Sequence, residues 1–274
     1  MQLEREGELR FIAHLLCVCA LVASPVRAET SLIELDTLDK AQQWAAVGRI
    51  NVRGIGFCTG TLISPTRVLT AAHCIYDQST GERAAPGDIM FLADFRNGKA
   101  EATRKVRRTA THPRYSIFAE DAVTGVSYDM AILELDSPIQ LAGIRPFELA
   151  TQPERGNGVS VVSYAANRSE TPSLEELCHV LARKDATVVL SCDVDFGSSG
   201  SPVFTIGPDG IARIVTIITA MVWVEGEKVA LGASLEMSLS PLFKRITAND
   251  WDSAQSPAIV QNLNSDIGAK FIKP

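Results

Sequence analysis

The sequence of 274 residues lacks the features that hold a chain in a membrane or on a nucleic acid. Its longest apolar run, at residues 11–23, is shorter than the roughly 18 residues of a transmembrane helix, so we expect no membrane span. Acidic residues outnumber basic ones by 32 to 26, and the net charge of −6 gives no support to nucleic-acid binding. Internal repeats and low-complexity tracts are also missing. With 46% hydrophobic and 21% charged side chains, the composition is that of a soluble globular protein.

The first 28 residues differ from the rest of the chain. Arg5 and Arg10 precede the apolar run, and the segment ends in the triplet VRA, an arrangement typical of a secretory signal peptide. We therefore expect residues 1–28 to be removed on export, and the protein to be secreted or periplasmic. Their removal takes away three acids and three bases, so the net charge of the mature chain stays at −6.

Cysteine is scarce in the mature chain, because two of the six residues, Cys17 and Cys19, leave with the signal peptide. An even number of cysteines in an exported protein favours disulfide bonds. The four that remain are Cys58, Cys74, Cys178 and Cys192. His179 adjoins one of them, but no second His/Cys pair follows at the spacing of a zinc site, so we expect no metal and no cofactor.

Short apolar or β-branched runs alternate with turn residues along the mature chain, which indicates an all-β protein. The runs with the clearest strand composition lie at residues 67–70, 131–135, 159–162 and 187–190.

Turn signals and prolines predict the connections between these strands. The sequences GPDG at residues 207–210 and EGEK at 225–228 each separate two apolar runs, so each predicts a hairpin. Three prolines in residues 136–158 indicate a connection between two halves of the protein. A short helix is predicted at residues 241–246.

Three polar residues in these β-rich segments are candidates for catalysis. His73 lies between a predicted strand and Cys74, a setting that would immobilise a general base. Asp129 precedes an apolar strand, where a buried carboxylate needs a partner. By accepting the Nδ1 proton of His73, it would set the tautomer of the imidazole and stabilise the imidazolium.

Ser199 is the candidate nucleophile, because it lies in a Gly/Ser turn where the backbone can bend sharply and a substrate can approach. The backbone N–H groups of Gly197 and Ser199 would converge on the oxyanion that develops when this serine attacks a carbonyl. A lone serine or histidine of this kind is more often structural, but the three together favour catalysis.

The segments around these residues resemble the active-site motifs of trypsin-like serine proteases: TAAHC at residues 70–74, DMA at 129–131 and GSSGSP at 197–202. The last of them is most similar to the bacterial branch that includes glutamyl endopeptidases. The resemblance covers residues 47–246 and implies two six-stranded antiparallel β-barrels packed together, with the active site in the cleft between them and a short C-terminal helix.

The resemblance also divides the chain and pairs its cysteines. It implies an N-terminal barrel at residues 29–145, a C-terminal barrel at 146–248 and a tail at 249–274. The family has a disulfide bond beside its catalytic histidine, which implies a Cys58–Cys74 bond and leaves Cys178 to pair with Cys192.

Ser198 departs from the family pattern. Members that are activated by cleavage carry an aspartate before the nucleophile, and this aspartate binds the new N-terminal ammonium. With serine in that position, we expect activity without a cleaved, Ile-like N-terminus.

Substrate specificity remains open at this level. Counting back from Ser199 without a gap places Asp193 at the base of the primary specificity pocket, which would favour Lys or Arg before the cut. Alignment with a Tyr-Asp pair of glutamyl endopeptidases makes the same residue structural. Ile218 stands where those enzymes have a substrate-binding histidine, so acidic specificity is not expected. Thr219 and Met221 follow in the pocket strand, and the methionine would narrow the pocket and favour small or medium apolar residues.

The sequence therefore predicts a monomeric serine endopeptidase that hydrolyses protein or peptide substrates through an acyl-enzyme. The alternative is a pseudoprotease that keeps the fold and acts as a binding module.

Overall fold

The computed structural model describes residues 31–119, 122–151 and 153–253 of the chain. The predicted signal peptide, residues 1–28, lies outside this part, as do residues 254–274 of the predicted tail. None of the helices in the described part is long and apolar enough to cross a membrane.

Six strands in the first half of the chain close into an antiparallel barrel in the order β2-β3-β4-β7-β6-β5. They are β2 (Val47–Val52), β3 (Gly56–Ser64), β4 (Arg67–Thr70), β5 (Ile89–Ala93), β6 (Ala102–Thr111) and β7 (Ala131–Leu135). Two of the predicted strands, residues 67–70 and 131–135, coincide with β4 and β7.

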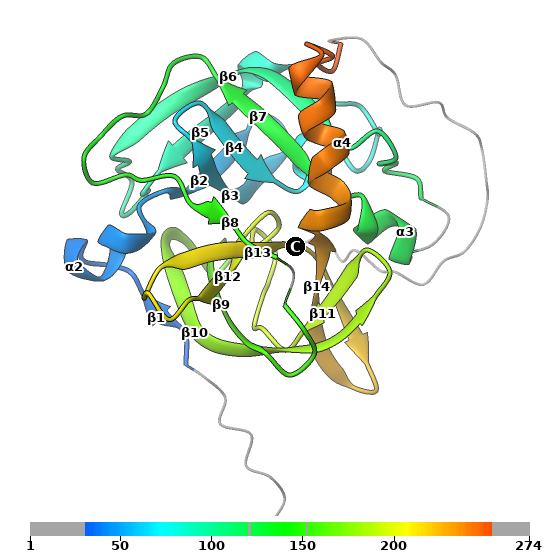
Figure 1. Cartoon of the computed structure of the whole chain (residues 1–274). Helices are drawn as coiled ribbons and strands as arrows, with labels where there is room; N and C mark the ends of the chain where they lie inside the picture. Colours follow the sequence, from blue (N-terminus) through cyan, green and yellow to red (C-terminus); the bar gives the residue numbers. More distant parts are fainter. Residues whose placement is uncertain (1–30, 120–121, 152, 254–274) are drawn as a thin grey trace, which may run out of the picture.

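Six further strands form a second closed barrel below the first in Figure 1, because β10 pairs with β9 as well as with β11. They are β9 (Gly158–Ala165), β10 (Arg168–Lys184), β11 (Thr187–Leu190), β12 (Pro202–Ile206), β13 (Ala212–Val224) and β14 (Glu227–Ser234). Two short strands join this sheet, β1 (Ile33–Glu34) beside β10 and β8 (Glu148–Leu149) beside β13. The predicted architecture of two six-stranded antiparallel barrels is confirmed, and so are both predicted hairpins.

Helical segments are short except for the last one. They are α2 (Leu38–Ala41), η1 (Gln42–Trp44), η2 (Ala72–Ile75), η3 (Pro86–Asp88), α3 (Ala122–Ser127) and α4 (Leu235–Thr247). The helix predicted at residues 241–246 therefore begins six residues earlier, with Pro241 inside it. Its buried apolar residues, Leu235, Leu239, Leu242 and Ile246, recur at helical spacing on both sides of the proline. Proline has no backbone N–H, so Pro241 cannot make one of the hydrogen bonds of the helix. The free energy gained by burying these apolar side chains compensates for this loss.

One aromatic cluster joins the two barrels. The ring of Phe204 in β12 lies 5.0 Å from that of Trp44 and 4.6 Å from that of Phe147, measured between centroids. Buried residues of both barrels continue from this cluster into one hydrophobic core. The barrels are therefore held in a fixed relation, which a site built from both of them requires.

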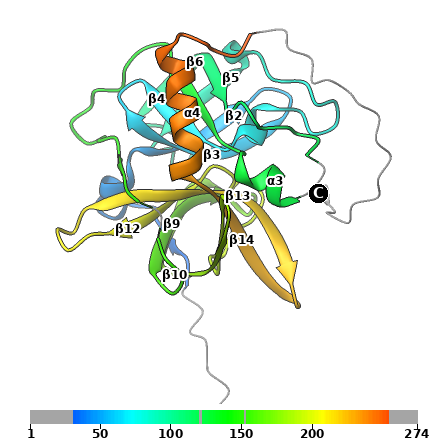
Figure 2. The same ribbon diagram turned by 45° about the vertical axis from the view of Figure 1, so that its right-hand side comes forward.

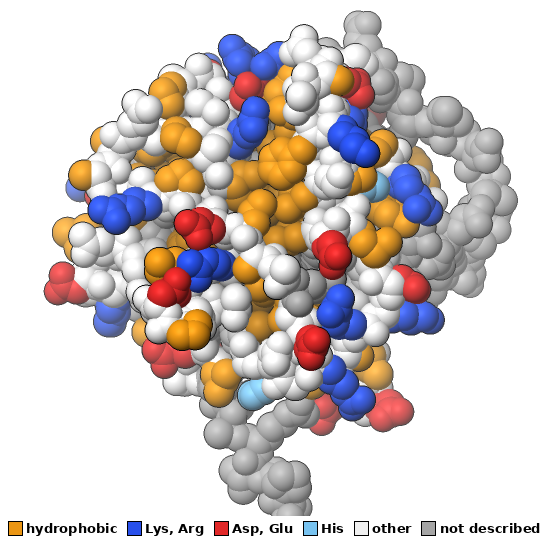
Figure 3. Space-filling view, viewed as in Figure 1, with side chains coloured by type: hydrophobic (Ala, Val, Ile, Leu, Met, Phe, Trp, Pro, Cys, Tyr) orange, Lys and Arg blue, Asp and Glu red, His pale blue; other side chains and the backbone are white. Residues whose placement is uncertain are grey.

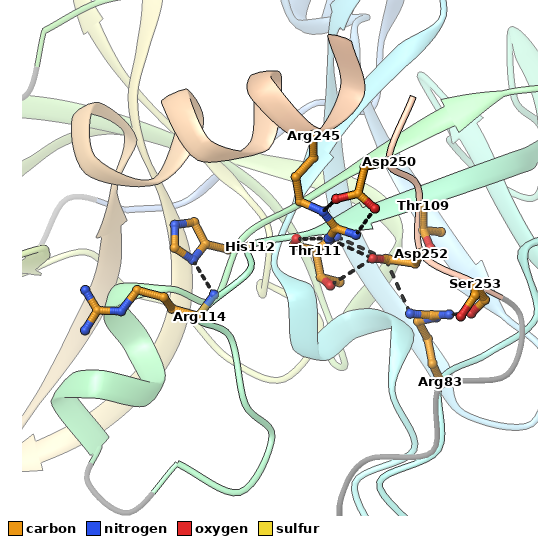
Figure 4. Close-up of polar contacts among 9 residues, drawn as sticks. All are labelled: Arg83, Thr109, Thr111, His112, Arg114, Arg245, Asp250, Asp252 and Ser253. Carbon is orange, nitrogen blue, oxygen red and sulfur yellow. Dashed lines mark hydrogen bonds and ion pairs between the residues drawn. The ribbon is translucent and has the colours of Figure 1, made fainter. Parts of the chain in front are cut away.

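Hydrogen bonds and ion pairs of the segment after α4 connect this helix to the first barrel (Figure 4). The buried carboxylate of Asp252 accepts hydrogen bonds from Thr109 Oγ1 and the Thr111 N–H, both at 3.0 Å, and from Arg245 of α4 at 2.9 Å. Arg83 also faces this carboxylate, at 3.5 Å. Because β6 belongs to the first barrel and α4 follows the second, this ion-pair cluster adds a further link between them.

Candidate active site

His73 is held by a short helical turn, η2, that directly follows strand β4. Ala71 and Ala72 before it are fully buried, so a larger side chain at either position would have to displace its neighbours. Cys74 after it forms a disulfide bond with Cys58 of β3, and the second bond joins Cys178 of β10 to Cys192. Both predicted disulfides are confirmed, and the first ties the histidine turn to the neighbouring strand.

Asp129 binds His73 at two points. One carboxylate oxygen lies 2.6 Å from Nδ1 of the imidazole, and the other accepts the backbone N–H of the same residue at 2.8 Å. The aspartate is buried, whereas a quarter of the histidine side chain is exposed. This arrangement directs Nε2 away from the carboxylate and leaves it available to another group.

The environment of the imidazole changes its affinity for a proton. Burial acts to lower the pKa of His73, but the charge of Asp129 and its hydrogen bond outweigh burial, so the pKa is raised above its ordinary value. The pair therefore favours the imidazolium, the form that a general base reaches when it takes up a proton.

A second histidine, His112, packs against the residue that precedes Asp129. Tyr128 stacks on the buried ring of His112, with the centroids 4.8 Å apart. Burial, with the positive charges of Arg114 and Arg245, lowers the pKa of His112 to about 4, so its ring is neutral above that pH. The carbonyl of His112 accepts the N–H of Tyr115 at 2.8 Å, so this residue also begins a turn. Through its stacking on Tyr128, the ring of His112 also packs against the segment that carries Asp129, just before strand β7.

Ser199 lies in a turn whose two glycines admit no side chain. Gly197 has φ +94°, and a Cβ added there would lie 2.3 Å from the ring of Phe57. Gly200 has φ +78°, and a Cβ there would lie 2.2 Å from the carbonyl oxygen of Thr59 and 3.0 Å from the nitrogen of Ala71. Only glycine tolerates both the positive φ and the close approach. The turn thus packs directly against the segment that leads into His73.

The backbone amides of this turn divide into two groups. The N–H groups of Ser198, Gly200 and Ser201 donate to backbone carbonyls at 2.9, 2.7 and 3.0 Å. Those of Gly197 and Ser199 have no acceptor within the part of the chain that the structure describes. Two unused N–H groups on either side of one residue are the donors that an oxyanion requires.

The hydroxyl of Ser199 makes no hydrogen bond to His73 among the described residues. Instead, Nε2 of the histidine lies 4.0 Å from Sγ of Cys74. Hydrogen bonds between catalytic groups are commonly long in a free enzyme and shorten when substrate binds.

Thr59 joins the serine turn to the first barrel, a role that sequence reasoning missed. Its Oγ1 donates to the Gly197 carbonyl at 2.9 Å and accepts the N–H of Tyr164 at 3.1 Å. Its own N–H donates to the carbonyl of Ser199 at 2.9 Å. No local pattern signals this role, because the partners are more than 100 positions away in the chain.

Asp193 does not lie free in a buried pocket. Its side chain is half exposed, and Oδ1 forms an ion pair with Lys228 of β14 at 2.5 Å. Its backbone N–H donates to the buried carboxylate of Glu175 at 2.7 Å. The lysine therefore neutralises the charge that the gapless alignment placed at the base of the pocket.

The two other predicted pocket residues follow on β13. Thr219 is buried, and its hydroxyl donates to the carbonyl of Leu231 at 3.2 Å. Met221 is partly buried and packs against a second cluster of core residues that includes Val194 and Ala230. The structure thus brings apolar side chains, rather than an unpaired charge, to this part of the strand.

A groove formed by described residues lies away from the predicted site residues. It has a volume of about 720 Å³ and runs along α4, where it is lined by residues that include Leu235, Leu239 and Phe243. Figure 3 shows apolar side chains gathered beside this helix. None of the predicted site residues lines the groove.

Among the residues that the structure describes, two groups of side chains come close enough to hold a metal ion. Each includes two cysteines, namely Cys58 and Cys74 with His73, and Cys178 and Cys192 with Glu175. All four are in disulfide bonds, so they offer no thiolate ligand.

A family model of the trypsin-like peptidase domain matches residues 58–209, more than half of the chain. The chain belongs to this family. The matched region contains His73, Asp129 and Ser199.

The curated relatives of this trypsin-like chain include peptidases of two names. The chain is 30% identical over 151 residues to a glutamyl endopeptidase of Bacillus licheniformis, over 55% of this chain and 46% of the relative. It is 31% identical over 110 residues to a trypsin of Saccharopolyspora erythraea, covering 40% and 43% of the two chains. A trypsin of Phaedon cochleariae is 39% identical over 99 residues, covering 34% and 33%. The chain thus spans less than half the length of these relatives.

A solved structure of a Glu endopeptidase in complex with MPD shares the fold. The two superimpose with a TM-score of 0.64 over 81% of this chain and 98% of the other, at 16% sequence identity. At this identity the similarity concerns the fold alone.

Ser198 forms internal hydrogen bonds in this family member. The residue is fully buried, its Oγ donates to the carbonyl of Tyr164 at 3.1 Å, and it accepts the N–H of Asp195 at 3.2 Å. Groups within the turn therefore satisfy the hydroxyl. That activity needs no cleaved N-terminus stays a prediction.

Proposed function

We propose that the protein is an exported serine endopeptidase with His73, Asp129 and Ser199 as its catalytic triad. The observation that carries this proposal is the combination of two features in one place. A histidine is bound to a buried carboxylate through Nδ1, and the serine turn packed against the histidine segment carries two unused N–H groups.

The proposed reaction uses these groups in order. His73 Nε2 takes the proton of the Ser199 hydroxyl while Oγ attacks the scissile carbonyl, and the oxyanion binds the amides of Gly197 and Ser199. The imidazolium then protonates the leaving amine, and an acyl-enzyme remains on Oγ. Water, deprotonated by the same imidazole, attacks the acyl carbon and releases the acid. Asp129 stays ionised and stabilises the imidazolium.

The two disulfide bonds support export, because such bonds persist in oxidising compartments. We propose a secreted or periplasmic monomer with a signal peptide at residues 1–28. In the proposed division, the barrel at residues 29–145 carries the histidine and the aspartate. The barrel at residues 146–248 carries the serine, and a tail follows at 249–274.

The alternative function is that of an inactive binding module. The missing hydrogen bond between His73 Nε2 and Ser199 Oγ, among the described residues, favours this alternative.

Labelling with a fluorophosphonate separates the two functions, because only an activated serine reacts quickly with it. We expect the purified, oxidised protein to be labelled stoichiometrically on Ser199, and the Ser199→Ala and His73→Ala variants to remain unlabelled. Peptide mapping identifies the modified residue. A folded wild-type protein that stays unlabelled after prolonged exposure would support the binding module.

For specificity, we propose a pocket that prefers small or medium apolar residues before the cut. This proposal rests on the ion pair of Asp193 with Lys228 and on the apolar contacts of Met221. A lysine or arginine of the substrate would have to displace Lys228 from the aspartate. An acidic preference is not proposed, because Ile218 supplies no positive charge.

Releasing the aspartate should change this preference. We expect Lys228→Met to increase cleavage after Lys and Arg by about tenfold relative to cleavage after apolar residues, because an unpaired carboxylate attracts a cation strongly. A cleavage-site profile on a denatured proteome measures the ratio. The matched control is Lys184→Met, which removes the same charge from the exposed end of β10. A basic preference in the wild type that survives Asp193→Ser would remove this aspartate from the pocket.

A further inference from the structure

Consecutive peptide groups of the serine turn are held in two different ways. Those whose N–H belongs to Ser198 and Gly200 are bound at both ends, because the N–H donates to a backbone carbonyl and the C=O accepts a hydrogen bond. Those whose N–H belongs to Gly197 and Ser199 are bound only at the C=O, by backbone N–H groups at 2.7 and 3.0 Å. The two kinds alternate, so each proposed oxyanion donor is followed by a peptide group that is fixed at both ends.

One residue of the first barrel, Thr59, binds the carbonyls of both fully bound peptide groups. It lies in β3, on the side of the first barrel that faces the second (Figure 2). Its hydroxyl donates to the carbonyl of Gly197 at 2.9 Å, and its backbone N–H donates to that of Ser199 at 2.9 Å. The backbone N–H is available from any residue except proline, but the bond to Gly197 requires a side chain with a hydrogen-bond donor.

The hydroxyl of Thr59 is itself fixed by its surroundings. The side chain is fully buried, and Oγ1 accepts the N–H of Tyr164 in β9 at 3.1 Å. Because a backbone N–H already points at this oxygen, its own proton is directed at the Gly197 carbonyl. The carbonyl of Thr59 accepts the hydroxyl of Thr70 at 2.8 Å, three residues before His73. This residue therefore also connects the serine turn to the histidine segment.

Gly197 depends on such contacts for its orientation. Glycine lacks the Cβ that restricts the backbone of other residues, so its φ of +94° is not maintained by the residue itself. The peptide group before it is bound through the carbonyl of Phe196, which accepts the N–H of Ala166 at 2.7 Å, and the one after it through the Thr59 hydroxyl. In a trans peptide the N–H points opposite to the C=O, so these bonds determine where the N–H of Gly197 points.

We propose that Thr59 is a positioning residue for the oxyanion: its hydroxyl fixes Gly197 so that the N–H groups of Gly197 and Ser199 converge before the substrate binds. This inference rests on the proposed function. The hydroxyl is buried beneath the turn and acts on the reaction only through Gly197. Donors that are oriented in advance need no reorganisation when the negative charge develops, and this is the main source of their effect on the rate.

Replacement of Thr59 by valine tests the proposal, because valine keeps the β-branched shape and removes the hydroxyl. The substrate is a peptide built on a bond that the protein cleaves in denatured casein. We expect kcat to fall by about 10- to 100-fold, which is less than the loss of an oxyanion donor costs, and KM to change by less than about twofold. Thr59→Ser keeps the hydroxyl and should retain kcat within about threefold of the wild type.

The matched control is Thr61→Val, two residues further along β3. The side chain of Thr61 is also fully buried, and its hydroxyl donates to the carbonyl of Ala46 at 3.4 Å rather than to the serine turn. Both valine variants lose a buried hydrogen bond, so the unfolding temperature should fall in both. Only Thr59→Val should lower kcat.

A peptide aldehyde of the same sequence distinguishes positioning from a general loss of structure. Oγ of Ser199 adds to the aldehyde carbon, its proton passes to His73, and the carbonyl oxygen becomes an alkoxide at the oxyanion position. We expect the inhibition constant to rise in Thr59→Val by the same factor by which kcat/KM falls, because both report transition-state binding. The midpoint of the pH profile should stay in place, since the pair of His73 with Asp129 is unchanged.

Three results would overturn the inference while the wild type continues to hydrolyse peptides. They are an unchanged kcat in folded Thr59→Val, an unchanged inhibition constant of the aldehyde in that variant, and a loss of kcat in Thr59→Ser as large as in Thr59→Val. If valine prevents folding, Thr59→Ala is compared with Thr59→Ser and Thr61→Ala in the same way. If the wild type cleaves no peptide and binds no fluorophosphonate, the proposed function fails instead.

Discussion

Replacement of Ser199 by alanine is expected to reduce peptide hydrolysis by about 10⁴-fold or more, because the acyl-enzyme cannot form without its oxygen. His73→Ala should have an effect of the same size, since without the general base the hydroxyl is a weak nucleophile. Residues that act as one unit are not additive, so the double variant should be no slower than either single variant. Initial rates on denatured casein, with active-site titration, measure the loss.

The matched control for these variants is Ser201→Ala, two residues further along the same turn. The hydroxyl of Ser201 is buried and has no hydrogen-bond partner among the described residues, so its removal should leave the rate and the folding unchanged. Thermal unfolding and mapping of both disulfides establish that all variants fold. If folded Ser199→Ala keeps more than a tenth of the wild-type rate, the assignment of the nucleophile is wrong.

Replacement of Asp129 by asparagine should change both the rate and its dependence on pH. We expect kcat to fall by about 10³- to 10⁴-fold, because the amide favours the wrong tautomer of the imidazole and no longer stabilises the imidazolium. The wild-type rate is lost as pH falls and His73 becomes protonated, with a midpoint above the ordinary value of about 6.5, because the pKa of this histidine is raised. In the variant, burial alone acts on the pKa of His73, so the midpoint should move to lower pH.

Profiles of kcat/KM between about pH 4 and 9 measure this shift. Asp252→Asn is the matched control, because the side chain of Asp252 is also buried but binds Arg245, Thr109 and Thr111 rather than the histidine. It should lower the unfolding temperature and leave the midpoint of the profile in place. An unchanged midpoint in Asp129→Asn would remove the aspartate from the proposed triad.

The fold could be predicted largely from local patterns. The segments at residues 67–70, 131–135 and 187–190 combine strand length with β-branched or apolar residues, and they form β4, β7 and β11 with the same limits. Helix α4 was predicted too short, because a proline commonly marks a helix start, and only the packing of residues on both sides of Pro241 shows that the helix continues through it.

Some features of the candidate site could likewise be predicted from local motifs, and others only from the structure. By itself the sequence determined which side chains carry the chemistry, since His73, Asp129 and Ser199 each lie in a short motif that constrains the local backbone. It also predicted a sharp backbone bend at the serine turn, and the two glycines there have positive φ in the structure. The ion pairs of these residues and the ends of strand pairing could not be predicted in this way, because they depend on residues far apart in the chain.

Only the tertiary structure decided that Lys228 neutralises Asp193, 35 positions away, and that Thr59 fastens the serine turn to the first barrel. It also decided that β13 pairs with β12 only as far as Ile217, while its pairing with β14 continues to Val224. Electrostatic and hydrogen-bond partners depend on distance in space, and a local sequence pattern contains no information on the distance between two strands of a closed barrel.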